Sequence, residues 1–415
     1  MNAAWQPVLD AAARAPALET VYSIAEDLAK QAVDGPLLAR GKAGVAILYA
    51  YLALARADHG DEQTAVRLLN QAVDAVAAMK MAPCFFTGFA GIAWANAHLE
   101  GRVLHSIDED ANDEIDLVLQ THLRQSPWRG DYNLLTGLVG FGVYALERMP
   151  REAAINCLES IIDRLGETAE RTAVGITWFT PPDEHGGHGH YNLGLAPGVP
   201  GVIAFLAQVC APGDERLGRA RTKTRPLLDG AVAWLLAQQS ADGTQGFPSK
   251  MGPGISPTPA RIAWCYGDLG IAVALLRAAR DVQKPAWEEK ALMIADRAAN
   301  RRPEIAGVKD CGLCHGAAGV AHLFNRLFQA TGDSGYAAAA RFWFARTLEM
   351  RRPGSGIAGF SALFPEAGVE RWVLEPGLLR GAAGIGLALL AAATPIEPSW
   401  DRMLLVSSSF RRTSF

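Results

Sequence analysis

Seven strongly apolar segments recur along the chain, and each opens with the pattern Gly-x-x-Gly. A largely apolar run follows the second glycine, as in GKAGVAILYAYLALA and GVPGVIAFLAQV. The spacings between successive first glycines are 47, 49, 61, 69, 49 and 65 residues. A pattern that returns at such spacings predicts a protein built from repeats. The first glycines are Gly41, Gly88, Gly137, Gly198, Gly267, Gly316 and Gly381.

Amphipathic segments separate these apolar runs. Their apolar residues recur three or four positions apart with charged residues between them, which is typical of a helix that buries one face. The clearest examples are residues 61–79, 151–169, 225–239 and 288–300. Each repeat therefore predicts one apolar inner helix and one amphipathic outer helix.

Seven inner helices surrounded by seven outer helices predict an all-α fold, namely an α/α toroid or seven-fold double-layered helical barrel. We expect a single domain over residues 1–415, with the repeats between about residues 20 and 405. The glycines allow tight turns and close backbone contact where each inner helix begins. We expect these turns to lie at one end of the ring and to carry the chemistry.

Composition narrows the class of protein. Half of the 415 residues are hydrophobic and 20% are charged, which suits a chain with a large core. The net charge of -4 gives no general reason to expect nucleic acid or an anionic membrane as partner. We find no secretory signal and no apolar run of membrane-spanning length. The sequence thus predicts a cytoplasmic protein without membrane insertion, and its six irregularly spaced cysteines are expected to be reduced.

Two repeats differ from the others just before the first glycine. WCYGDLG places Cys265 two residues before its glycine, and LCHGAAG places Cys314 at the same position, followed by His315. Equivalent positions of adjacent repeats are neighbours in a ring, so these three side chains are candidates to converge. Two thiolates and an imidazole leave a fourth tetrahedral position open, as in catalytic zinc sites. We predict one Zn2+ per chain; the alternative is a pair of buried, unligated cysteines.

A redox function for the Cys311/Cys314 pair is a competing interpretation. Such a C-x-x-C motif normally occurs in a thioredoxin-like βαβ setting, whereas this chain predicts helices. Cys311 also has no counterpart in the preceding repeat. We therefore expect Cys311 to lie outside the site.

WCYG at 264–267 and LCHGAAG at 313–319, on seven G-x-x-G helical repeats, resemble the lanthionine synthetase C family of LanC-like lanthipeptide cyclases. The resemblance implies an α/α toroid and zinc-dependent addition of peptide cysteine thiols to dehydroalanine or dehydrobutyrine, which forms (methyl)lanthionine thioether rings. It also implies a dehydrated precursor peptide as substrate and a separate dehydratase as partner.

The same resemblance assigns roles to individual residues. Cys265, Cys314 and His315 match the zinc ligands of the family. Arg261 and Tyr266 match residues placed around the reacting centre. In physical terms, Arg261 would stabilise the enolate formed on addition, and Tyr266 would donate a hydrogen bond or proton to it.

Two positions depart from the family pattern. Pro197 stands where many cyclases have the histidine of a GLAHG motif, and Asn133 stands where they have an aspartate. Proline cannot transfer a proton, and asparagine cannot act as a carboxylate. Asp131 and the segment DEHGGHGHYN offer substitutes, of which His190 is our candidate acid; the alternative is a flexible polar loop with solvated histidines. The other histidines of that segment are His185 and His188.

These departures leave two further functions open. One is a catalytically impaired relative that binds peptides as a scaffold. The other is an enzyme of the same kind that adds a different thiol to dehydroamino acids.

Overall fold

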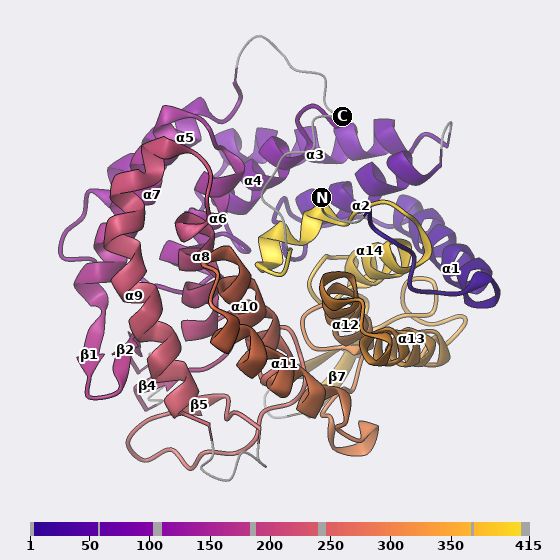
Figure 1. The fold of residues 1–415 in the computed structure, drawn as a ribbon. Coiled ribbons are helices and arrows are strands. Elements are labelled where there is room, and N and C mark those ends of the chain that lie inside the picture. The colour runs from indigo at the N-terminus through magenta and orange to yellow at the C-terminus, as the bar shows by residue number, and fades with distance from the viewer. Residues whose placement is uncertain are drawn as a thin grey trace.

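The computed structural model describes residues 4–56, 59–102, 110–182, 188–239, 246–366 and 369–407. Within them the chain forms fourteen α-helices in two concentric layers (Figure 1), and the predicted all-α toroid is confirmed. Each Gly-x-x-Gly pattern begins an inner helix. The inner helices are α2 (Lys42–Ala55), α4 (Phe89–Leu99), α6 (Leu138–Glu147), α8 (Val199–Cys210), α10 (Asp268–Asp281), α12 (Ala317–Thr331) and α14 (Ala382–Ala393).

The outer layer covers these helices and closes the ring. Most outer helices pack on the inner helix that precedes them in the chain, but α1 packs on α14 at the other end of the sequence. Helix α14 also contacts α2, so the first and last repeats are neighbours. The outer helices are α1 (Ala11–Lys30), α3 (Asp61–Ala78), α5 (Asp113–Leu123), α7 (Glu152–Thr168), α9 (Gly218–Ala237), α11 (Pro285–Ala299) and α13 (Ser334–Glu349).

The two glycines of each pattern have different structural roles. The first glycine is the N-cap of its inner helix in all seven repeats. The second lies against the backbone of the turn that leads into the helix. A Cβ atom on Gly319, for example, would lie 1.9 Å from the carbonyl oxygen of Leu313, so no side chain fits. The pattern therefore reflects close backbone packing at one end of the ring.

Three short antiparallel sheets form in the segments that connect the helices of the ring. One hairpin joins β1 (Glu170–Thr172) to β2 (Gly175–Thr177). A second sheet has the order β3 (Phe179–Thr180), β4 (His190–Asn192), β5 (Lys250–Met251), with Tyr191 opposite Met251. The third joins β6 (Ala362–Glu366) to β7 (Val369–Val373), with Leu363 opposite Trp372.

The centre of the ring is filled by the C-terminal part of the chain. Figure 1 shows this yellow segment inside the inner helices. It contains the 3-10 helix η3 (Ser399–Leu404), all of whose residues are buried. Two other 3-10 turns, η1 (Glu215–Leu217) and η2 (Pro303–Ile305), lie in loops. The core is thus continuous from the inner helices to the central segment.

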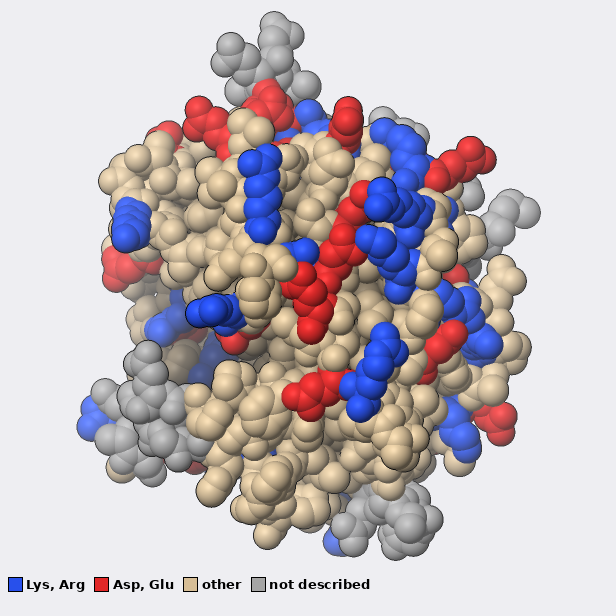
Figure 2. All heavy atoms as spheres, turned by 90° about the vertical axis from the view of Figure 1, so that its left-hand side faces the viewer, with Lys and Arg blue, Asp and Glu red and all other residues tan. Residues whose placement is uncertain are grey.

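Charges of both signs are mixed on the outer surface. On the face shown in Figure 2, Lys and Arg side chains lie among Asp and Glu. One ion pair between outer helices joins Lys223 of α9 to Asp163 of α7 at 2.5 Å. In the ranges that the structure covers, no helix combines the length and apolar character needed to span a bilayer.

Candidate metal centre

A chain of backbone hydrogen bonds runs from turn to turn where the inner helices begin. The N–H of Cys265 donates to the carbonyl oxygen of Cys314 at 3.2 Å, and the N–H of Cys314 donates to that of Leu379 at 2.7 Å. Each residue in this series of hydrogen bonds stands two positions before the first glycine of its repeat. The bonds continue from Leu379 to Ala39 (3.2 Å), from Ala39 to Phe86 (3.1 Å) and from Phe86 to Leu135 (3.2 Å).

This register brings the Cys/His set together. One ligand atom from each of Cys265, Cys314 and His315 lies within 4.8 Å of the other two. The Sγ atom of Cys265 is 4.0 Å from Nδ1 of His315. Cys265 is buried, and the other two side chains are partly exposed, so the group is open on one side. Three soft or borderline donors at such separations suit a tetrahedral ion with one free position.

The two thiols strongly influence each other. The Cys314 thiol, together with the His315 imidazole, lowers the pKa of Cys265 to about 5 against the opposing effect of burial. The Cys265 thiolate and burial in turn raise the pKa of Cys314 well above its usual value. In the absence of metal, the pair therefore behaves as one thiolate and one thiol that share a proton. A divalent cation that binds both sulfurs has to displace that remaining proton.

Asp310 lies behind His315, at ion-pair distance but beyond hydrogen-bond distance. Its Oδ2 atom lies 4.0 Å from Nε2 of His315, on the ring nitrogen other than the one beside Cys265. The same Oδ2 atom accepts the backbone N–H of Leu363 in β6 at 3.3 Å. The carboxylate is 2% exposed, which favours a fixed position. A carboxylate next to the outer nitrogen of a metal-binding histidine orients the ring and increases its basicity.

Positive charges surround the Cys/His set. Other effects dominate the pKa of both cysteines, namely their mutual hydrogen bond and burial, but Arg261 adds a smaller lowering effect on the pKa of Cys265 and Arg380 on that of Cys314. The guanidinium of Arg380 stacks on Phe364 of the β6–β7 hairpin at 3.6 Å. Nearby cations favour thiolates and other anions at this end of the ring.

Tyr266 lies immediately after Cys265 and is oriented by Asn192 of β4. The amide Nδ2 of Asn192 donates to the phenol oxygen at 3.3 Å, which leaves the phenol proton free to be donated elsewhere. Burial raises the pKa of Tyr266, so the phenol stays protonated at neutral pH. Tyr266 can thus act as a hydrogen-bond donor beside the thiols.

Pro197 lies at the same end of the ring. A Cβ atom built on Gly194 would be 2.8 Å from Cδ of Pro197, 2.8 Å from Cδ1 of Tyr266 and 2.3 Å from the carbonyl oxygen of Cys265. Gly194 therefore packs between the proline and the Cys265–Tyr266 turn. The position that carries histidine in many cyclases is close to the Cys/His set here, but its side chain is aliphatic.

Asn133 has a structural role in the third turn. Its Oδ1 atom accepts the N–H groups of Leu135 at 2.8 Å and of Thr136 at 3.0 Å. Because Leu135 is used in this way, Leu134 makes the bond to the fourth turn, donating to Ala196 at 3.2 Å. Asp131, our other candidate, accepts the hydroxyl of Thr136 at 2.5 Å.

In the described part of the loop before the fourth turn, no hydrogen bond or ion pair joins His188 or His190 to the Cys/His set. His190 lies in β4, and its Nδ1 atom is 3.1 Å from the carbonyl oxygen of His188. No described hydrogen bond links it to Tyr266 or to the two cysteines. It shares a strand face with Asn192, two residues further on, which does contact Tyr266. His185 falls outside the described residues.

Cys311 does not belong to the group formed by Cys265, Cys314 and His315. Its Sγ atom faces the carbonyl oxygen of Thr347 in α13 at 3.7 Å, and burial raises its pKa to about 12. It lines a cavity of about 470 Å³ between α13 and the β6–β7 hairpin, which Asp310 also lines. All six cysteines are free of disulfide bonds.

Comparison of the repeats two positions before glycine identifies the cysteines but misses Asn192 and Asp310. Both stand six positions before the first glycine of their repeat, where three of the other repeats also carry a polar side chain. Their side-chain oxygens accept the N–H two residues later, at 3.0 Å for Asn192 and 3.3 Å for Asp310. A polar residue six positions before the first glycine was therefore the sequence feature that could have identified Asn192 and Asp310. The other polar residues there are Asp131, Arg261 and Glu375.

Known proteins share both the sequence pattern and the fold. The model of the family described as "Lanthionine synthetase C-like protein" matches residues 32–405. Among solved structures, the fold is similar to that of "Nisin cyclase", with a TM-score of 0.68 and 18% sequence identity over 95% of this chain and 97% of that one. At this identity the structural likeness speaks for the fold alone. The family match spans most of the sequence, and the chain therefore belongs to the lanthionine synthetase C-like family.

Proposed function

We propose that this protein is a zinc-dependent cyclase that adds cysteine thiols of a dehydrated peptide to dehydroalanine or dehydrobutyrine. The observation that carries the proposal is the convergence of Cys265, Cys314 and His315 within 4.8 Å at the open end of the ring. Membership of the lanthionine synthetase C-like family and the fold shared with nisin cyclase support it.

The donor set fits zinc. Two cysteine sulfurs and one histidine nitrogen, with a carboxylate behind the histidine, are typical of catalytic zinc sites that keep one position open. Zinc bound there would lower the pKa of a substrate thiol, so that the thiolate forms at neutral pH. We propose one ion per chain.

The chain's own residues would serve the rest of the reaction. Addition of the sulfur to the β-carbon breaks the carbon–carbon double bond and places negative charge on the oxygen of the resulting enolate. Tyr266, protonated and oriented by Asn192, would donate a hydrogen bond to that oxygen, and the charge of Arg261 would stabilise it. The thiol proton finally has to reach the α-carbon, so the atoms of substrate and product balance.

The source of that last proton distinguishes this chain from many cyclases. Pro197 occupies the position of their histidine, and its aliphatic side chain has no proton that it could transfer. We propose that solvent, or His190 from β4, delivers the proton. A separate dehydratase would supply the dehydrated precursor peptide.

Counting free thiols tests the activity. The substrate is a peptide with one cysteine and one dehydroalanine, incubated with zinc-loaded wild-type protein or with Cys314→Ala. Thiol should disappear with wild type, while the peptide mass stays constant, because ring closure is an addition. If wild type consumes thiol no faster than Cys314→Ala, the cyclase assignment is wrong for that peptide.

A peptide-binding scaffold is the second candidate, and the aliphatic side chain of Pro197 beside Tyr266 favours it. The same experiment separates the two functions. A scaffold would bind zinc and the dehydrated peptide, but would leave the thiol unreacted.

A further inference from the structure

The C-terminal segment inside the ring reaches the turn that carries Cys265. Residues Ser399 to Ser407 are all buried, with exposures of 9% or less. They lie among the inner helices, away from the chain's outer surface (Figure 1). Burial of a terminal segment that contains both Asp401 and Arg402 requires compensating partners.

Those partners come from several inner helices. Asp401 accepts from Arg326 at 2.6 Å and lies 2.7 Å from Nε2 of His322, both on α12. Burial alone would raise the pKa of Asp401, but Arg326 and His322 lower it below its usual range. Arg402 lies 3.4 Å from Glu147 at the end of α6. The segment is therefore held in place by paired buried charges on opposite parts of the ring.

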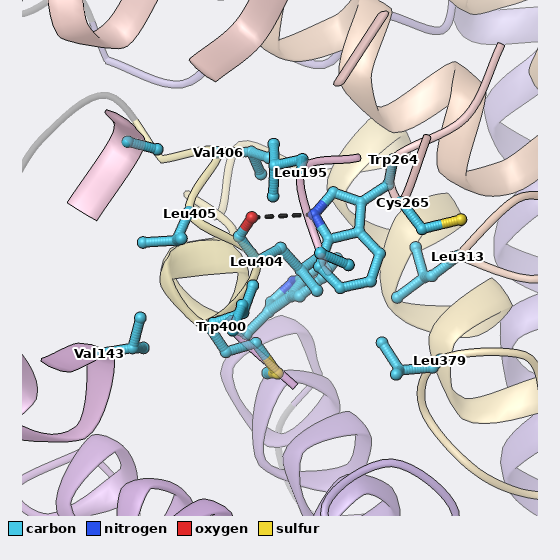
Figure 3. Close-up of a cluster of buried hydrophobic side chains, with 14 of the residues drawn as sticks. Val143, Leu195, Trp264, Cys265, Leu313, Leu379, Trp400, Leu404, Leu405 and Val406 are labelled. Atoms are coloured by element: carbon cyan, nitrogen blue, oxygen red, sulfur yellow. Dashed lines mark hydrogen bonds between the residues drawn. The ribbon is translucent and has the colours of Figure 1, made fainter. Parts of the chain in front are cut away.

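One contact joins this segment to the metal-binding turn. The indole N–H of Trp264 donates to the carbonyl oxygen of Leu404 at 2.9 Å, as the dashed line in Figure 3 shows. Trp264 is 1% exposed and immediately precedes Cys265. A buried indole N–H without a partner is costly, so the position of Leu404 restricts the position of the indole.

Cys265 is thus restrained from two sides. Its own N–H donates to Cys314, and its neighbour Trp264 is fixed by the C-terminal segment. The corresponding residue before Cys314 is Leu313, which has no polar side-chain atom and can make no such bond. Of the two cysteine turns, only the one with Cys265 is tied to the centre of the ring in this way.

We propose that Trp264 is a positioning residue and that the C-terminal segment, through Leu404, holds Cys265 in the geometry that binds the metal. The inference rests on the proposed metal site. The packing of the C-terminal segment inside the ring then increases the affinity for metal, and bound metal in turn stabilises that packing. Loosening the segment should weaken metal binding although no ligand is changed.

Substitution of Trp264 by phenylalanine removes the N–H and keeps an aromatic ring. The matched control is Trp178→Phe, because Trp178 is also fully buried and donates to a backbone carbonyl, that of Leu165, at 3.0 Å. Cobalt(II) is a suitable probe, since cobalt–thiolate absorption reports ligand geometry without any turnover. We expect Trp264→Phe to bind cobalt(II) about 10-fold more weakly, the lower end of effects typical of outer-shell partners, and with an altered spectrum. Trp178→Phe should match wild type in both.

A second variant covers the case in which Trp264→Phe does not fold. Asp401→Asn weakens the hold of α12 on the segment and leaves Trp264 and the ligands intact. It should also reduce cobalt(II) affinity, at temperatures where circular dichroism shows the metal-free protein to be folded. Wild-type affinity in either folded variant would overturn the proposed positioning role. Failure of wild type itself to bind cobalt(II) would refute the metal site and the positioning role with it, whereas absence of thiol addition alone would refute only the cyclase function.

Discussion

The backbone N–H of Cys265 donates to the carbonyl oxygen of Cys314 at 3.2 Å, although the two residues are 49 positions apart in the chain. The bond exists because both residues occupy the same position in adjacent turns of a closed ring. This register brings together two thiols and the imidazole of His315, a group whose ligand atoms lie close enough to hold a metal ion. The repeat architecture and the chemistry therefore have the same geometric origin.

Removal of the carboxylate behind His315 should weaken metal binding. Asp310→Asn keeps the shape of the side chain and its contact with Leu363, but loses the charge 4.0 Å from Nε2 of His315. We expect zinc affinity to fall by about 10–100-fold, measured by competition with a chelator. Asp131→Asn is the matched control, because Asp131 has the same register in a turn that carries no cysteine. Equal affinities for the two variants would exclude a supporting role for Asp310.

The second glycine of each pattern should tolerate no side chain. In Gly319→Ala the new methyl group would meet the carbonyl oxygen of Leu313, and overpacking of this kind costs about 1–3 kcal/mol of unfolding free energy. Gly218→Ala is the control, since a Cβ there has no neighbour within 4 Å and the backbone is helical. Urea unfolding should show a loss of stability for the first variant and none for the second. A neutral Gly319→Ala would contradict the packing explanation of the repeat.

Stability should decrease in mild acid because of buried His98. Its Nδ1 atom lies 3.1 Å from Glu147 and its Nε2 atom 3.0 Å from the hydroxyl of Tyr51. Burial, opposed by Glu147, lowers the pKa of His98 to about 4. The unfolded chain, with an ordinary pKa of about 6.5, binds more protons between these values, so unfolding free energy falls by about 2 kcal/mol from pH 7 to pH 5.

Urea unfolding at several pH values between 5 and 7 measures this effect. The variant His98→Gln can still donate a hydrogen bond to Glu147 but does not titrate. It should show a smaller loss of stability over the same interval. If the variant keeps the full pH dependence of wild type, the effect arises elsewhere.

Introduction of a histidine at position 197 should accelerate the proposed reaction. Pro197 packs against Gly194, which separates it from the Cys265–Tyr266 turn, so an imidazole at position 197 would be near the proposed reacting centre. General acid–base groups typically contribute about 10²–10⁴-fold, and we expect Pro197→His to raise kcat at least about 10-fold. Pro197→Gln makes the same backbone change without a proton donor of suitable pKa. Equal rates in both variants would show that proton delivery does not limit the proposed reaction.

The sequence predicts this fold well because the ring is built from local signals. Each inner helix starts at a glycine, and the outer segments at 61–79 and 151–169 correspond closely to α3 and α7. The register of the turns also follows from the repeats, which is why the repeat pattern by itself groups Cys265, Cys314 and His315. The expected seven inner and seven outer helices are confirmed.

Other features depend on contacts that no local pattern encodes. Residues 399–407 have no helical periodicity and contain charges, yet they are buried because Arg326 and Glu147 pair with Asp401 and Arg402 from distant repeats. From the sequence alone, Asn133 is only a replacement for the aspartate of the family, and the sequence does not predict that its side chain accepts two N–H groups of the turn. His190 remains a prediction, because the structure places it on β4 and gives it no bond to Tyr266.

The central claim is that the ring assembles one zinc site from Cys265, Cys314 and His315. Metal analysis of purified, zinc-equilibrated protein tests it most directly, with Cys314→Ala and the neighbouring Cys311→Ala compared side by side. We predict one zinc per chain in wild type and in Cys311→Ala, whose sulfur faces Thr347, and none in Cys314→Ala. A folded wild-type protein that retains no zinc, or a Cys314→Ala variant that retains it fully, would contradict the account.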